Sequence, residues 1–265
     1  MRAFRWTRLI LHGLVAFALV GAIFPRASQS TRARIVRWWS RKLLRILRVI
    51  PAIHGHPPDW QARNLVIVAN HISWLDIFVI NAVRPTRFVA KSEIRDWPFV
   101  GWLCEKSGTI FIKRAKRSDT HKINQVMHDV LAGGDCVGLF PEGTTTGGDR
   151  LRKFHSSLFE PAVVSGAKVM PLAIAYREED GERSLAPAYI EDVTFAQSIR
   201  AILDCPKLVV EVTCGDPLAA DAFKRRDLAS ACETLIARIL DVEVIRERLA
   251  LGGELAAQTE QFEET

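Results

Sequence analysis

Acidic residues are missing from the first fifty positions of this chain, although the whole sequence contains 30 of them. The same stretch holds ten Arg and one Lys, which gives it a charge of +11. Since all 265 residues together carry +6, the rest of the chain carries −5. The arginines alternate with Trp, Leu and Ile rather than with small polar residues. That mixture favours an anionic membrane surface over nucleic acid as the partner.

Paired cysteines are also lacking. The chain has five cysteines, an odd number, and none of them forms a CxxC spacing. This pattern argues against a disulfide framework and against a zinc site, and it favours reduced thiols in the cytoplasm. A GxSxG elbow is absent too, so the sequence does not indicate the serine nucleophile of the α/β-hydrolases.

One apolar run stands near the N-terminus, from Leu9 to Phe24, and three arginines precede it. A helix of these 16 residues spans about 24 Å, which is less than a hydrocarbon core of about 30 Å. The run therefore predicts either a shallow anchor or a single span. A signal peptide is the alternative, because the small residues Ala27 and Ser28 follow the apolar run in the expected order.

A second amphipathic segment covers residues 31–50. Its basic and apolar residues recur at helical spacing on two neighbouring stripes, which comprise Arg34, Arg37, Arg41, Arg45 and Arg48, and Ile35, Trp39, Leu43, Ile46 and Ile50. We expect this helix to lie in the membrane interface, and the alternative is a helix that packs on the domain with a solvated charged face. Residues 1–50 are thus predicted to be basic membrane-anchoring helices, monotopic or with a single anchor.

From residue 51 to 250 short β-branched runs alternate with helical segments, a pattern typical of one α/β domain. The expected strands are Leu65–Ala69, Arg87–Ala90, Thr109–Ile112, Cys136–Phe140, Val169–Ala175 and Leu208–Val212, and the expected helices are Trp74–Val83, Asp119–Leu131, Ser156–Val164 and Asp221–Leu240. Residues 251–265 form an acidic tail that we expect to be disordered.

The sharpest chemical signal is the segment Asn70-His71-Ile72-Ser73-Trp74-Leu75-Asp76, where an expected strand ends and a helix begins. Strand ends carry the chemistry of α/β folds. An imidazole next to a carboxylate can accept a hydroxyl proton near neutral pH, since the acid orients the ring. His71 is therefore a candidate general base and Asp76 its partner, while helix capping is the alternative explanation for Asp76.

Three further blocks follow in order. They are Gly108-Thr109-Ile110-Phe111-Ile112-Lys113-Arg114, Phe140-Pro141-Glu142-Gly143-Thr144, and Val169-Met170-Pro171-Leu172-Ala173-Ile174. Together with the Asn-His-x4-Asp block they resemble the glycerolipid acyltransferase family that includes the 1-acyl-sn-glycerol-3-phosphate acyltransferases. The resemblance covers roughly the middle 150 residues and implies a single domain with a central mixed sheet flanked by helices.

The resemblance also implies roles for individual residues. His71 would be the base and Asp76 its orienting partner, while Arg114 and Glu142 would hold the polar head of the acceptor. Gly143 and Thr144 would shape the binding turn, and amides near Gly143 are candidates for an oxyanion site. Lys91 is a further candidate for the substrate's anionic group.

The implied reaction moves a fatty acyl group from an acyl carrier protein or coenzyme A thioester to lysophosphatidate, forming phosphatidic acid at the cytoplasmic face of the cell membrane. The resemblance implies neither a metal nor a bound cofactor, and because a thioester is already activated, no serine or cysteine acyl-enzyme is required. One departure from the family pattern is that Thr145 and Thr146 stand where many members have Arg-Ser. Because a cation is missing there, a lyso-ornithine lipid is the closest rival acceptor.

Two explanations from other classes stay open at this point. A metal-dependent lipid hydrolase would use His71, Asp76 and Glu142 as ligands, since these are common ligand types. A non-enzymatic membrane adaptor would need only the basic head and a folded body.

Overall fold

The computed structural model describes residues 2–246 apart from residues 61, 99, 113–116 and 191. The strands are β1 (Val49–His54), β2 (Leu65–Ala69), β3 (Arg87–Lys91), β4 (Ile110–Ile112), β5 (Cys136–Leu139), β6 (Arg150–Arg152), β7 (Lys168–Arg177), β8 (Leu208–Cys214), β9 (Leu218–Ala219) and β10 (Glu243–Ile245). The α-helices are α1 (Arg2–Ala18), α2 (Gln29–Leu47), α3 (Asp76–Val83), α4 (Val100–Lys106), α5 (Arg117–Ala132), α6 (Glu160–Val164), α7 (Phe195–Asp204) and α8 (Arg225–Leu240). Shorter helical turns are η1 (Leu19–Ile23), η2 (Phe24–Arg26), η3 (Ser92–Asp96), η4 (Ser156–Phe159) and η5 (Ala220–Ala222).

The central sheet has the strand order β1-β8-β7-β2-β5-β3-β4, with β9 beside β7. The strands β7, β2, β5, β3 and β4 run parallel to one another, whereas β8 runs antiparallel to β7. The predicted mixed sheet is therefore confirmed. A separate parallel pair joins β6 to β10.

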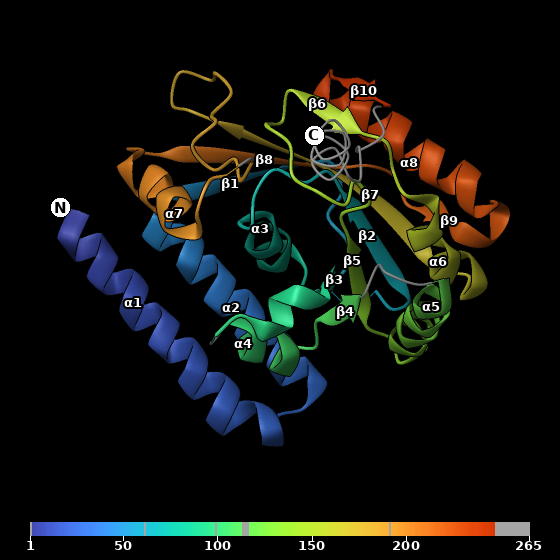
Figure 1. The fold of residues 1–265 in the computed structure, drawn as a ribbon, viewed down its shortest axis with the longest axis horizontal. Coiled ribbons are helices and arrows are strands. Elements are labelled where there is room, and N and C mark those ends of the chain that lie inside the picture. Colours follow the sequence, from blue (N-terminus) through green and yellow to red (C-terminus); the bar gives the residue numbers. More distant parts are fainter. Residues whose placement is uncertain (1, 61, 99, 113–116, 191, 247–265) are drawn as a thin grey trace, which may run out of the picture.

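Helices cover both faces of this sheet (Figure 1): α2, α3 and α7 lie on one face, and α5, α6 and α8 on the other. The central strand β2 is buried at all five positions. Leu65 and Ile67 pack into the cluster on the α3 face, while Val66 and Val68 pack into the cluster on the α8 face. Burial on both faces explains why this strand reads as an uninterrupted apolar run.

The strand β1 crosses the boundary that the sequence suggested between residues 50 and 51. It pairs in parallel with β8 at one edge of the sheet, which is where a strand tolerates a proline such as Pro51. Sequence analysis did not predict this strand, since Pro51, together with Pro57 and Pro58 shortly after it, pointed to a break in regular structure. The central sheet thus includes Val49 and Ile50, which the sequence assigned to the N-terminal segment.

The helix α2 packs on the domain, which was the alternative interpretation of its stripes. Leu43 and Ile46 are both 3% exposed, and Leu43 belongs to the α3-side cluster. On the charged side, Arg37 and Arg41 each donate a hydrogen bond from Nε to the carbonyl oxygen of Ala82, at 3.2 and 3.1 Å. Ala82 lies in the last turn of α3, where cations are favoured by the helix dipole. An interfacial placement is therefore wrong for Leu43 and Ile46, whereas Ile50 of the same stripe is exposed.

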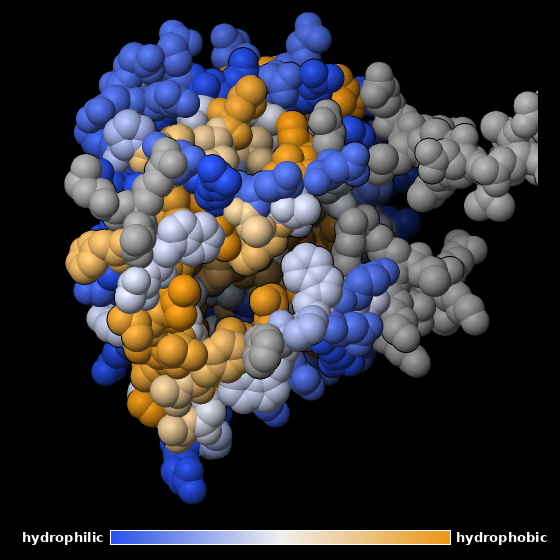
Figure 2. All heavy atoms as spheres, turned by 60° about the vertical axis from the view of Figure 1, so that its left-hand side comes forward, coloured by the Kyte–Doolittle hydropathy of each residue, from blue (hydrophilic) through white to orange (hydrophobic). Residues whose placement is uncertain are grey.

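The N-terminal helical segment Phe4–Arg26 is long and apolar enough to cross a membrane by length and composition, a test that signal sequences also pass. Its 23 residues correspond to about 34 Å, which is longer than the sequence run suggested. Arg5 holds α1 to the domain by donating to the carbonyl oxygens of Leu203 and Leu47. The opposite side of α1 exposes apolar residues, and Figure 2 shows orange side chains around a hollow on the face where α1 lies.

Candidate active site

The candidate site lies where β2 and β5 end. These strands are parallel neighbours, so their carboxyl ends meet at one edge of the sheet. The residues Asn70 to Asp76 follow β2, and the residues Phe140 to Thr144 follow β5. Sheet topology therefore brings together two blocks that are about 70 residues apart in the sequence.

His71 and Asp76 form the hydrogen-bonded pair that the sequence predicted. Nδ1 of His71 lies 2.9 Å from Oδ2 of Asp76, and the imidazole is 20% exposed while the carboxylate is fully buried. Because a carboxylate only accepts, the proton lies on Nδ1, and Nε2 of a neutral ring keeps its lone pair. The pair thus presents a basic nitrogen from a fixed ring.

Asp76 also organises the turn that carries His71. Its Oδ2 accepts hydrogen bonds from the backbone amides of Ile72 and Ser73, at 2.8 and 2.9 Å. Leu75, not Asp76, occupies the N-cap of α3. Capping is therefore not the explanation for Asp76, although the carboxylate does satisfy nearby amides. Its remaining oxygen, Oδ1, accepts from the hydroxyl of Tyr176 at 2.7 Å.

Glu142 links the turn after β5 to the turn after β2. Its Oε1 accepts from the amide of His71 at 2.7 Å, and its Oε2 accepts from the amide of Arg152 at 2.9 Å. The side chain is 1% exposed. Burial raises the pKa of Glu142 to about 8, although the two amide bonds act in the opposite direction. With both oxygens engaged, Glu142 is placed to fix the turns, and its sequence-predicted contact with the acceptor's head stays a prediction.

Two further contacts hold the histidine turn. The ring of His71 stacks on Phe140, with centroids 4.0 Å apart and planes 13° apart. Asn70 bonds to both backbone groups of Ile174, since its Nδ2 donates to the carbonyl oxygen at 2.9 Å and its Oδ1 accepts from the amide at 2.8 Å. The Asn70 side chain thus continues the β2–β7 ladder by one step beyond Ala69.

The turn around Gly143 is tight, and Gly143 has φ +75°, a conformation that favours glycine. Its amide donates to the carbonyl oxygen of Phe140 at 3.2 Å, so this hydrogen belongs to the turn rather than to an oxyanion site. Thr144 lies in the same turn and is partly buried. The next two threonines also bond within the protein: Thr145 donates from Oγ1 to the carbonyl oxygen of Tyr189, and the backbone amide of Thr146 donates to the carbonyl oxygen of His71 at 2.9 Å.

The two predicted cations cannot be placed fully. Lys91 is the last residue of β3, whose carboxyl end lies at the same edge as those of β2 and β5, and only its backbone is described. Arg114 lies outside the described residues. Their roles toward an anionic group remain predictions.

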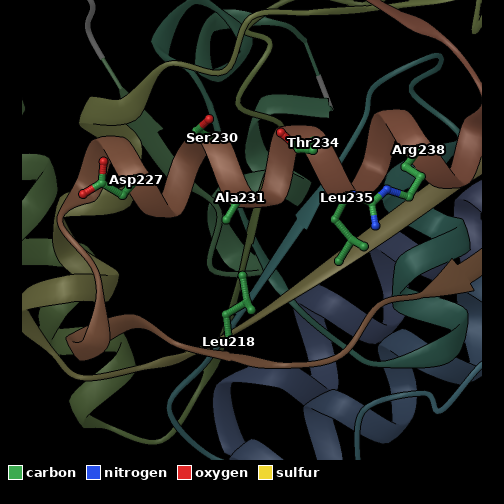
Figure 3. Close-up of a pocket in the computed structure, with 7 residues that line it drawn as sticks. All are labelled: Leu218, Asp227, Ser230, Ala231, Thr234, Leu235 and Arg238. Carbon is green, nitrogen blue, oxygen red and sulfur yellow. The ribbon is translucent and has the colours of Figure 1, made fainter.

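A groove of about 500 Å³ lies on the other side of the fold, between α8 and β9 (Figure 3). It is lined by Leu218, Asp227, Ser230, Ala231, Thr234, Leu235 and Arg238. None of the predicted site residues belongs to this lining. Among the described residues, no group of three or more His, Cys, Asp or Glu side chains is arranged to hold a metal ion.

Sequence analysis missed Tyr176, the tyrosine that bonds to Asp76. The available signal was strand alternation, since Met170, Leu172, Ile174 and Tyr176 follow one another at every second position of an apolar run. All four are buried in the α3-side cluster. The sequence does not indicate that the phenol would bond to Asp76, because the two residues are 100 positions apart.

Comparisons with known proteins give a consistent result. The family model described as "Acyltransferase" matches residues 47–175. A lyso-ornithine lipid O-acyltransferase of Pseudomonas aeruginosa is 34% identical over 92% of this chain and 89% of its own length. A 1-acyl-sn-glycerol-3-phosphate acyltransferase of Neisseria gonorrhoeae is 39% identical over 158 residues, which are 60% of this chain and 62% of that protein.

Among solved structures, the crystal structure of the 1-acyl-sn-glycerophosphate acyltransferase PlsC from Thermotoga maritima has a similar fold. The TM-score is 0.66 at 22% identity, and the match covers 91% of this chain and 97% of that one. At this identity the likeness concerns the fold. It agrees with the mixed sheet and flanking helices described above.

Proposed function

Because this chain belongs to the acyltransferase family and is an O-acyltransferase, we propose that it acylates the free hydroxyl of a lyso-ornithine lipid, with His71 as the general base. The observation that carries the mechanism is the 2.9 Å contact between Nδ1 of His71 and the buried Asp76. Family membership, the fold and the enzyme class agree with the expectations from the four sequence blocks. The adaptor explanation is wrong, since the relatives are named as enzymes.

In the proposed reaction Nε2 of His71 takes the proton from the acceptor hydroxyl. The alkoxide oxygen then bonds to the thioester carbonyl carbon, the carbon–sulfur bond breaks, and the thiolate leaves with the proton from the imidazolium. Asp76 stabilises the charged ring during this step. No acyl-enzyme is needed, since a thioester is already activated.

The choice of acceptor rests on two observations. The similarity to lyso-ornithine lipid acyltransferases runs over nearly the whole chain, including 95% of it for the Rhizobium meliloti protein. In addition, Thr145 and Thr146 replace the Arg-Ser expected for a phosphomonoester acceptor and bond within the protein. The acceptor first expected from the sequence, lysophosphatidate, is the second candidate, supported by the 39% identity to the Neisseria enzyme.

We further propose that the donor is an acyl carrier protein or coenzyme A thioester and that neither a metal nor a bound cofactor takes part. Full transfer activity in excess EDTA is expected. Loss of activity that returns with a divalent cation would instead favour the metal-dependent alternative.

The proposed location is the cytoplasmic face of the cell membrane. The exposed apolar residues of α1 support a membrane contact, and they include Ile10, Leu11 and Leu14, which are 60, 55 and 58% exposed. An acceptor with a lipid chain is delivered most directly to an enzyme attached to the bilayer surface.

The acceptor is tested with purified enzyme in mixed micelles and labelled acyl thioesters of both carriers. Lyso-ornithine lipid and lysophosphatidate are supplied separately, and kcat/KM is measured for each. We expect the lyso-ornithine lipid to be preferred by about ten-fold or more, the size of effect that one buried polar mismatch produces. A preference for lysophosphatidate would overturn the acceptor assignment and leave the acyl-transfer assignment intact.

A further inference from the structure

The side chain of Tyr176 is buried against the candidate site, although nothing in the proposed reaction uses it. It lies on β7, on the face that packs against α3, and it is 1% exposed. Its hydroxyl donates to Oδ1 of Asp76 at 2.7 Å. Burial and the charge of Asp76 raise the pKa of Tyr176 well above its usual value, so the phenol stays a donor at every working pH.

The hydrogen bonds of Asp76 divide unequally between its two oxygens. Oδ2 receives three donors, which are the amides of Ile72 and Ser73 and Nδ1 of His71. Oδ1 receives only Tyr176 among the bonds found in the described part of the chain. A fully buried carboxylate needs donors on both oxygens, and its plane is fixed only when both are held.

We propose that Tyr176 is a positioning residue of the acyl-transfer reaction, which holds the carboxylate of Asp76 in the plane that orients His71 and limits how strongly that carboxylate favours the protonated ring. The inference rests on the proposed function of His71. Tyr176 does not contact the reacting atoms itself, since the carboxylate lies between the phenol and the imidazole.

The electrostatic part of the proposal has a definite sign. The phenol points the positive end of its O–H dipole at Asp76 and so reduces the negative potential at the ring. Removing the hydroxyl makes that potential more negative and favours the protonated imidazolium. Among the described residues, Glu142 in the turn after β5 interacts electrostatically with Asp76, and Arg152 on β6 interacts with Glu142; the change leaves both in place.

The test is Tyr176→Phe, which removes one oxygen and keeps the ring. We expect kcat to fall about ten-fold, because a hydrogen bond to a charged group contributes about 1.5–3 kcal/mol and part of it is lost here. KM should change by less than about two-fold, since no substrate contact is removed. The acid limb of the kcat/KM profile should move to higher pH by about half a unit.

A matched control is Thr86→Val. Thr86 donates from Oγ1 to the carbonyl oxygen of Arg84 at 2.7 Å, and it precedes β3, at the opposite edge of the sheet. This isosteric change also removes one hydroxyl bond, and we expect it to lower the unfolding midpoint by a similar amount with kcat and the pH profile unchanged.

A second measurement strengthens the hydrogen bond from Tyr176 instead of removing it, so the acid limb of the pH profile should move in the opposite direction. The chain contains two tyrosines, Tyr176 and Tyr189, so in a Tyr189→Phe background 3-fluorotyrosine enters at Tyr176 alone. The fluorinated phenol is a stronger donor, and the acid limb should move to lower pH than in the unlabelled Tyr189→Phe enzyme.

An unchanged kcat in Tyr176→Phe, or a fall in kcat with no movement of the acid limb in either experiment, would overturn the proposal. An equal loss of kcat in Thr86→Val would do so as well, since the effect would then reflect stability alone. Failure of the proposed function is distinguishable, because it appears as retained activity in His71→Ala.

Discussion

Replacing Glu142 with Gln is expected to change how the stability of the fold depends on pH. Burial raises the pKa of this carboxyl from 4.5 to about 8. The folded protein therefore holds a proton that the unfolded chain releases. The stabilisation from this group is fully present below about pH 4.5 and is lost as the pH rises through about 8.

The size of the effect follows from the two pKa values. Between about pH 5 and pH 8 the wild-type protein should lose about 3 kcal/mol of unfolding free energy from Glu142, whereas Gln cannot ionise. At acid pH the variant has a lower unfolding free energy than the wild type, because the NH2 group of the introduced glutamine would face one of the two backbone N–H donors, that of His71 or that of Arg152. That mismatch costs about 1–3 kcal/mol. The difference in unfolding free energy between the wild type and the variant is thus widest in acid, narrows as the pH rises, and closes or reverses by about pH 8.

The assay is denaturant unfolding in detergent, followed by tryptophan fluorescence at constant ionic strength from about pH 5 to 8.5, with kcat measured in parallel. We expect kcat to fall about ten-fold, since the His71 turn loses its link to the turn after β5. Glu233→Gln is the matched control for activity. Glu233 lies on α8 and also accepts from a backbone amide, that of Phe154 at 2.7 Å, and we expect this substitution to leave kcat unchanged. A gap that stays constant or widens with pH would refute the reasoning, since Glu142 would then be charged in the fold.

Two other substitutions test neighbouring parts of the account. Asn70→Ala should lower the free energy of unfolding by about 2–4 kcal/mol, because both backbone groups of Ile174 lose their partners; a denaturant midpoint equal to that of the wild type would contradict the role of this side chain. Changing Ile10, Leu11 and Leu14 together to Ser should move the protein from the membrane to the soluble fraction with its unfolding midpoint retained, and unchanged membrane recovery would speak against α1 as the contact surface.

The parts of the fold that sequence analysis predicted are those with a local signal. The run Leu65–Ala69 matches β2 because a strand buried on both faces must be apolar throughout. The helix α7 was missed even though Thr194 and Gln197 form a capping box, a pattern visible in the sequence. The strand β1 was missed for a different reason, since only its place at the sheet edge makes Pro51 acceptable.

The contacts of the candidate site also fall into those with a local sequence signal and those without one. His71 and Asp76 are close in sequence, and the turn between them is set by amides of the same segment, so their pairing was predictable. The two amide bonds of Glu142 and the phenol of Tyr176 join segments 71, 10 and 100 positions apart. Those contacts depend on strand order, which local patterns do not specify. For the same reason, the stripes of α2 showed an amphipathic helix without showing what its apolar side meets.

The most direct test of the account is the turnover of His71→Ala with its preferred acceptor and thioester donor. The fold and membrane recovery should match the wild type, because the bonds from Glu142 and Thr146 that hold this turn go to the backbone of His71 and not to its ring. We predict a loss of kcat of about a thousand-fold, the usual contribution of a general base. A variant that retains kcat within about ten-fold of the wild type would contradict the claim that His71 removes the acceptor's proton.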